Sequence, residues 1–264
     1  MEFWFEDEEN YNEYKQLIFR RDHYRKEANG YLAMYIHEFG ELHTEAFRLK
    51  TSCLEKKRAI KFCLMYVNIG KAVDLGKLAS YLEGCTVGFQ RQLSGMVHDN
   101  EVCKKLRIAS NSDAVEIEKL YRVISEKLNP ELNPAVCGNP ELMRLWGRTL
   151  GAYRGNDLED LYMLDILAED AIKGLGDGVQ IVEIPGMKLK MRQLTREIDA
   201  IITTDPYRYK FLFDDKRSVE VKKATIRDDI AAYRRYEEHL ERYLKKLFRE
   251  GVKIQWRDDT DKEE

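Results

Sequence analysis

Histidines and cysteines are the residues of this chain best suited to acid–base, nucleophilic or metal chemistry. His98 and Asp99 are adjacent and have the types of a catalytic pair, but an exposed helical pair is the favoured interpretation. His37 and His43 are six residues apart, a spacing that does not place two ligands on one helical face. The cysteines lie at positions 53, 63, 85, 103 and 137, and no two have C-x-x-C spacing. These residues predict no catalytic centre, no metal site and no cofactor.

Two other segments have the composition of a binding site. Residues 174–178 contain three glycines, yet they lack the preceding strand and the Lys-Ser/Thr ending of a phosphate-binding loop. Lys56, Lys57, Arg58 and Lys61 form a basic cluster. This cluster could meet an acidic partner or phosphates, and a solvated helix face is the favoured alternative. Because nucleophile, base and metal ligands do not converge in the sequence, we expect a protein that is not an enzyme.

The most specific pattern in the chain lies between residues 112 and 172. Ser112 or Asp113, with Glu116 in the first turn, has the chemistry of a helix start. Pro130 biases the residue before it towards extended backbone, so the helix should end near Asn129. The loop 129–139 is short enough to force the next helix, 140–154, to run antiparallel.

A third amphipathic helix should follow over residues 157–172, capped by Asn156-Asp157. Apolar residues recur at helical spacing on one face of each of the three helices. Three faces of this length can bury a small shared core. The predicted core residues are Ile117, Leu120, Tyr121, Ile124 and Leu128, then Leu142, Leu145, Trp146, Thr149, Leu150 and Tyr153, then Leu158, Leu161, Tyr162, Leu164 and Leu167.

Several short matches in this segment resemble the J domain of co-chaperones. Leu120-Tyr121-Arg122 is similar to the apolar–aromatic–basic pattern of the family's second helix, and Asn129-Pro130-Glu131-Leu132-Asn133-Pro134 resembles its His-Pro-Asp-Leu-Asn-Pro variant. Leu145-Trp146 and Ala152-Tyr153 match apolar positions of the family's third helix, and Asn156-Asp157-Leu158 matches a variant in which the next helix follows at once. The match covers roughly a quarter of the chain. The family's first helix is not recognisable, and residues 74–106 stand in its place.

The resemblance implies a helical hairpin that docks on an Hsp70 chaperone. In that family a His-Pro-Asp tripeptide and a basic helix contact the partner. Two departures from the family weaken such docking. In the tripeptide, Asn129 lacks the imidazole of histidine, and Glu131 has its carboxylate on a side chain one methylene longer than that of aspartate. In the helix, residues 113–128 carry three basic and four acidic side chains. The partner-binding residues that the resemblance implies are Asn129, Pro130, Glu131, Lys119, Arg122 and Lys127.

Three interpretations of the tripeptide remain open. It can be an ordinary helix-ending turn, part of a J-like fold without a chaperone role, or a working Hsp70 site. The second is favoured and predicts a non-enzymatic adaptor or scaffold for an unidentified protein partner. The alternative function is a J-domain co-chaperone that docks on Hsp70 through the altered tripeptide. The chain is also similar to bacterial, chiefly clostridial, helical proteins that place such a segment between long helices, and the motif of residues 205–212 carries that similarity.

Composition favours an all-α protein. The chain has 264 residues, of which 44% are hydrophobic and 34% charged, and its five prolines all lie at or beyond position 130. The net charge of −3 argues against a nucleic-acid surface. No apolar run is long enough to span a membrane, and the acidic N-terminus does not resemble a signal peptide. With an odd number of cysteines, these features predict a cytoplasmic protein.

The predicted organisation has five parts. The region 1–110 contains long helices, one helix or two in series over residues 11–68 and another over 74–106. The J-like module occupies 111–173. A flexible connector, 174–186, includes one strand candidate at 179–184. Helices at 187–203 and from 214 or 215 to 249 form the region 187–250, and 251–264 is a charged tail. The last helix has an apolar stripe suited to coiled-coil packing. The stripe predicts either an antiparallel coiled-coil-like stalk with the N-terminal helices or a homodimer. Its residues are Ile226, Ile230, Tyr233, Leu240, Leu244 and Leu247.

Overall fold

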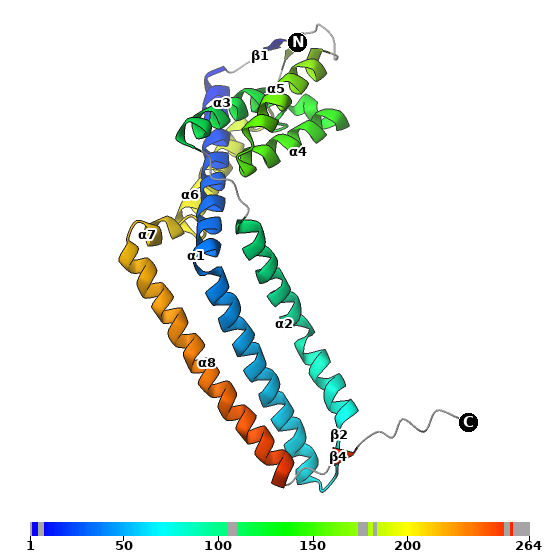
Figure 1. The fold of residues 1–264 in the computed structure, drawn as a ribbon. Coiled ribbons are helices and arrows are strands. Elements are labelled where there is room, and N and C mark those ends of the chain that lie inside the picture. Colours follow the sequence, from blue (N-terminus) through cyan, green and yellow to red (C-terminus); the bar gives the residue numbers. More distant parts are fainter. Residues whose placement is uncertain are drawn as a thin grey trace, which may run out of the picture. The chain divides into compact units, whose positions relative to one another are not determined.

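The computed structural model describes residues 2–4, 8–104, 110–173, 179–181, 184–250 and 254–255, and the chain is all-α as predicted (Figure 1). The parts of the connector 174–186 and of the tail 251–264 that fall outside these ranges are not described. The helices are α1 (Glu8–Asn68), α2 (Leu75–Lys104), α3 (Asn111–Leu128), the 3-10 helix η1 (Pro134–Gly138), α4 (Pro140–Gly155), α5 (Leu158–Lys173), α6 (Met187–Thr203), α7 (Tyr209–Phe213) and α8 (Lys216–Glu250).

Two short parallel strand pairs accompany the helices. Strand β1 (Glu2–Trp4) pairs with β3 (Val179–Ile181), and β2 (Val73–Asp74) pairs with β4 (Ile254–Gln255). The strand candidate at 179–184 is therefore confirmed over its first three residues. Within the described ranges, no helix combines the length and the apolar character that crossing a bilayer requires.

The chain divides into two compact units, and both are discontinuous in sequence. The first unit contains Met1–Met34 and Lys105–Phe211, and the second contains Tyr35–Lys104 and Leu212–Glu264. These units cut across the expected regions 1–110 and 187–250, because α1 contributes to hydrophobic cores of both units. The expected module 111–173 lies wholly within the first unit.

Helices α3, α4 and α5 form a three-helix module in the first unit. Helix α3 begins after Ser110, whose hydroxyl accepts a hydrogen bond from the backbone N–H of Asp113. The helix therefore starts a few residues earlier than predicted, because this serine already caps its free N–H groups. Asn139 caps α4 in the same way, and the backbone of Asn156 is left-handed where α4 ends.

The core of the α3–α5 module agrees with most of the predicted residues. The rings of Tyr121 and Tyr153 stack with their centroids 3.8 Å apart, and Trp146 packs beside Tyr121. Tyr162 and Leu167 were expected in this core but are 47% and 39% exposed. Helix α5 instead buries a narrower stripe with steps of three and four residues, formed by Leu161, Leu164 and Ala168.

A second core in the first unit joins the start of α1 to α6 and to the loop after α3. Tyr14, Ile18 and Phe19 of α1 pack with Leu132 of the loop and Leu194 of α6. Leu132 is fully buried. The loop that carries the tripeptide is therefore part of a hydrophobic core.

The second unit is a three-helix bundle of α1, α2 and α8. The residue numbers of paired side chains increase in the same direction along α1 and α8, since Glu38 pairs with Lys223 and Lys56 pairs with Glu237. Helix α8 therefore runs parallel to α1, which corrects the expected antiparallel stalk for this pair. The reason is where α8 begins. Phe213, just before α8, packs against Phe39, near the start of the part of α1 that belongs to the second unit, so α8 and this part of α1 run from the same end of the bundle.

Helix α2 does run antiparallel to α1. Thr44 pairs with Asn100, and Arg58 with the carbonyl of Cys85. Asn100 is accommodated by Gly40, since a Cβ at residue 40 would lie 2.0 Å from the Oδ1 atom of Asn100. The turn between α1 and α2 uses Gly70 in a left-handed conformation, followed by Asp74 as the cap of α2.

Candidate functional site

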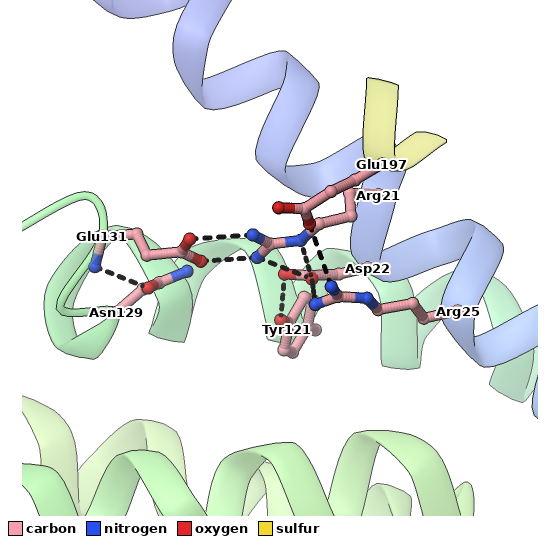
Figure 2. Close-up of polar contacts among 7 residues, drawn as sticks. All are labelled: Arg21, Asp22, Arg25, Tyr121, Asn129, Glu131 and Glu197. Atoms are coloured by element: carbon pink, nitrogen blue, oxygen red, sulfur yellow. Dashed lines mark hydrogen bonds and ion pairs between the residues drawn. The ribbon is translucent and has the colours of Figure 1, made fainter. Parts of the chain in front are cut away.

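The tripeptide Asn129-Pro130-Glu131 lies against α1, and this contact is the centre of the candidate site (Figure 2). Arg21 of α1 donates hydrogen bonds to the carboxylate of Glu131 from both terminal nitrogens of its guanidinium. The distances are 2.8 Å from Nη1 to Oε1 and 2.5 Å from Nη2 to Oε2. Only 7% of the Arg21 side chain is exposed, against 43% of Glu131. A bidentate pair with one buried partner holds the loop in one orientation.

Asp22 and Tyr121 extend this contact into α3. The Nε atom of Arg21 donates to the Oδ1 atom of Asp22 at 2.9 Å, and the hydroxyl of Tyr121 donates to Oδ2 of Asp22 at 2.8 Å. Arg25 lies one turn further along α1, 4.0 Å from Asp22 and 3.0 Å from Glu197 of α6. We call Arg21, Asp22, Tyr121 and Glu131 the Arg21 network.

The two carboxylates of the Arg21 network have opposite pKa shifts. Burial opposes the ionisation of Glu131, but the hydrogen bonds and charge of Arg21 outweigh it and lower the pKa of Glu131. At Asp22 burial is the stronger effect and raises the pKa, although Arg21 and Tyr121 oppose it. The pair between Arg21 and Glu131 is therefore favourable when ionised, whereas Asp22 depends on its partners to carry charge.

Asn129 is a structural residue in this arrangement. It ends α3 with φ −71° and ψ 117°, the extended geometry expected before Pro130, and is 1% exposed. Its Oδ1 atom accepts a hydrogen bond from the backbone N–H of Glu131 at 2.9 Å. Its Nδ2 atom is buried without a hydrogen-bond partner among the described residues. The side chain therefore shapes the turn and is not presented on the surface.

A second polar cluster links α1 to α3 and α4 through Glu118. The hydroxyl of Tyr153 donates to this carboxylate at 2.7 Å, Arg122 donates at 3.2 Å, and the Nδ1 atom of His23 lies 3.6 Å away. Burial opposes its charge, but His23 and Tyr153 lower the pKa of Glu118 to about 2. In turn, the hydrogen bond with Glu118 raises the pKa of His23.

Lys26 borders this second cluster on α1. Its ammonium lies 4.0 Å from the centroid of the Tyr153 ring. Burial lowers the pKa of Lys26 to about 8. Charged groups of α1 thus contact the α3–α5 module and its loop from Arg21 to Lys26, over about one and a half helical turns.

The basic residues expected to bind a partner are largely occupied within the chain. Lys127 bridges Asp165 and Glu169 of α5 at 2.9 and 3.1 Å. Arg122 pairs with Glu118 and lies over the ring of Phe19. Lys119 has 69% of its side chain exposed, with Glu116 3.5 Å away. The six expected residues therefore do not form one exposed surface.

The site is suited to holding segments together. Each charged group of the Arg21 network faces an opposite charge, and Glu118 is matched by His23 and Arg122. Among the described residues, no three His, Cys, Asp or Glu side chains gather closely enough to bind a metal ion.

Sequence reasoning missed Arg21 and Asp22, although a signal was present. Both occupy the helical stripe that contains Tyr14 and Ile18. Charged residues on an otherwise apolar stripe indicate that the stripe meets polar partners. The partner itself could not be read from local pattern, because Glu131 lies 110 residues away from Arg21.

The chain was compared with protein-family models, with curated proteins and with solved structures, and none of them matches it.

Proposed function

We propose that this protein is a non-enzymatic adaptor that binds a protein partner through the α3–α5 module. The proposal retains the resemblance to J domains for the fold of this module and assigns it a different contact surface. The observation that carries it is an exposed apolar face on α5. Tyr162, Met163 and Ile166 are 47%, 55% and 64% exposed. Large apolar side chains clustered on one helical face typically mark a protein contact.

The tripeptide loop is the less suitable surface. A partner that docked there would have to compete with Arg21 for Glu131, and Leu132 behind it is fully buried. Breaking a pair with a buried partner leaves an uncompensated charge, which costs several kcal/mol. The cost of freeing Glu131 therefore favours the adaptor over a co-chaperone. We place the protein in the reducing cytoplasm, a proposal supported by five free cysteines.

The adaptor proposal is tested by replacing the apolar face of α5. The variant Met163→Glu with Ile166→Glu should lose partners that wild-type protein retains after cross-linking in its own cells. The matched control is Leu189→Glu with Phe211→Glu, which changes two residues of the same unit that are 59% and 60% exposed. If both variants retain the same partners, the α5 face is not the contact surface.

The co-chaperone alternative has its own assay. Wild-type protein should not accelerate ATP hydrolysis by the source organism's Hsp70, since Glu131 is held by Arg21. The variant Arg21→Ala frees the carboxylate without altering the tripeptide. Stimulation by the wild-type protein would replace the adaptor proposal with a co-chaperone. Stimulation by Arg21→Ala alone would show that α1 masks a competent docking loop.

A further inference from the structure

The bundle of α1, α2 and α8 has a groove on the side formed by α1 and α8. The groove has a volume of about 590 Å³. On α1 its lining residues recur at steps of three, one, three, one and three along a single face, and are Lys57, Ile60, Lys61, Leu64, Met65 and Asn68. The stretch of twelve residues from the first to the last corresponds to about 16 Å of helix. The groove is therefore as long as about three helical turns.

The α8 side of the groove is a matching stripe. Tyr236, His239, Leu240 and Tyr243 line it at steps of three, one and three residues. Leu240 forms a buried floor at 6% exposure, whereas Tyr236 and Tyr243 are 40% and 42% exposed. Met65 on the opposite side is 54% exposed. Two parallel helices thus leave an apolar channel, a shape that receives the apolar face of another helix.

The charged side chains that line the groove are all basic. Lys57 and Lys61 line the α1 side, and no carboxylate lines either side. On α8, Arg235, His239, Arg242 and Lys246 follow one another at steps of four, three and four residues, so they share one edge of the helix, and all are exposed. Of the α8 carboxylates in this stretch, Glu237 pairs with Lys56 and Glu241 pairs with Lys245. Glu238 is exposed beside the basic edge but does not line the groove. An apolar channel with basic borders complements an amphipathic helix with acidic borders.

We propose that this groove binds an amphipathic helix of another protein, with about three turns of apolar residues flanked by Asp and Glu. Two residues of the basic cluster, Lys57 and Lys61, thereby gain a role in recognising acidic side chains. A second copy of this chain is a poorer occupant, because two such grooves facing each other would bring like charges together. The proposal concerns a different surface from the α5 face, so either can fail alone.

The test uses the full chain and a synthetic probe. The probe is a fluorescent peptide of roughly 18 residues with leucines at i, i+3, i+4 and i+7 and glutamates beside them. A second peptide keeps the leucines and replaces every glutamate with lysine. Fluorescence anisotropy should show that the acidic peptide binds at least about ten-fold more tightly than the basic one, with affinity falling as salt is added. Equal binding of both peptides, or no binding of the acidic one, would overturn the proposal.

Two variants locate the binding. The variant Lys57→Glu with Lys61→Glu should bind the acidic peptide about ten-fold more weakly than the wild-type protein does. The control Lys50→Glu with Lys216→Glu makes the same charge change at exposed residues outside the groove lining and should leave binding unchanged. The variant Met65→Ser with Tyr243→Ser should bind both peptides more weakly than the wild-type protein does. Circular dichroism verifies that this variant is folded.

Light scattering of the protein without peptide addresses self-association. We expect the same mass for the wild-type protein and for Met65→Ser with Tyr243→Ser. If the wild-type protein is a dimer that this variant dissociates, the groove is an interface between copies of the chain and the proposal is wrong. If the two groove variants bind as the control does, the peptide occupies another surface, which also overturns it.

Discussion

Arg21 and Glu131 form a bidentate ion pair across 110 residues of sequence, and this pair fixes the loop after α3 to the first part of α1 (Figure 2). The same guanidinium contacts Asp22, whose other oxygen accepts the Tyr121 hydroxyl. One arginine therefore compensates two carboxylates on different segments. Its removal should affect the first unit more than the loss of an ordinary surface charge.

The variant Arg21→Ala should lower the free energy of unfolding by about 3 kcal/mol, because Asp22 stays buried without its counter-charge. Urea denaturation measures this loss. The matched control is Arg25→Ala, which removes a guanidinium that is 45% exposed and should cost less than about 1 kcal/mol. Equal losses in the two variants would mean that the Arg21 network contributes no more than a surface pair.

The pair of His23 and Glu118 predicts how the free energy of unfolding depends on pH. The pKa of Glu118 is lowered to about 2 from 4.5, so its stabilisation is complete above pH 4.5 and is lost as pH falls towards 2. The pKa of His23 is raised above 6.5, so its contribution is complete below pH 6.5 and is lost as pH rises through the folded-state pKa. The pKa of Asp22 is shifted in the opposite direction, upwards. The stability of the wild-type protein is therefore compared with that of Glu118→Gln at each pH, so that the contribution of Asp22 cancels.

NMR titration tests this dependence at single residues. In Glu118→Gln the pKa of His23 should fall towards its ordinary value, because its main hydrogen-bond partner is lost. The control is His43 in the second unit, whose pKa burial lowers; it should not change in this variant. A His23 pKa that is the same in both proteins would contradict the proposed pairing.

The core of the α3–α5 module predicts a large effect of one substitution. Trp146 is 8% exposed and packs beside Tyr121, so Trp146→Ala should cost about 3–5 kcal/mol. Thermal or urea unfolding measures it. The variant Val115→Ala, at a position that is 70% exposed, should stay within about 0.5 kcal/mol of the wild type. A small loss at Trp146 would mean that this core is not packed as described.

The helices could be predicted closely because their signals are local. Helix α3 ends at Leu128, two residues before Pro130, and the turn before α2 contains Gly70 and the capping Asp74. The apolar stripes identify which helix faces are buried. The direction of α8 could not be predicted, since a stripe of apolar residues is the same whether its partner runs parallel or antiparallel. The exposure of Tyr162 was missed because α5 buries a narrower stripe than its apolar content suggested.

The candidate site was predictable only in part. The sequence identified Asn129 and Glu131 as unusual residues at a helix end, and the structure places both in a defined turn. Their partner Arg21 depends on the packing of distant segments, which neither spacing nor composition determines. Lys119 and Lys127 were grouped by their charge, but α5 neutralises Lys127 with two carboxylates that sequence alone does not place beside it.

Two glycines of α1 give a matched pair of predictions with opposite signs. A Cβ at Gly40 would lie 2.0 Å from the Oδ1 atom of Asn100, whereas nothing lies within 4 Å of a Cβ at Gly30. Asn100 is held by its hydrogen bond to Thr44 at 3.0 Å, so it cannot move without losing that bond. Gly40→Ala should therefore destabilise the protein by about 1–3 kcal/mol. Gly30→Ala should stabilise it by up to about 1 kcal/mol, because alanine favours helix.

Urea denaturation of both variants distinguishes the steric effect from helix propensity. The second substitution Asn100→Ala removes the atoms that a Cβ at residue 40 would meet, so Gly40→Ala should cost less in that background than in the wild type. If Gly40→Ala and Gly30→Ala both stabilise the protein, then α2 does not approach α1 closely at Gly40. The antiparallel packing of these two helices would then need a different register from the one that joins Asn100 to Thr44.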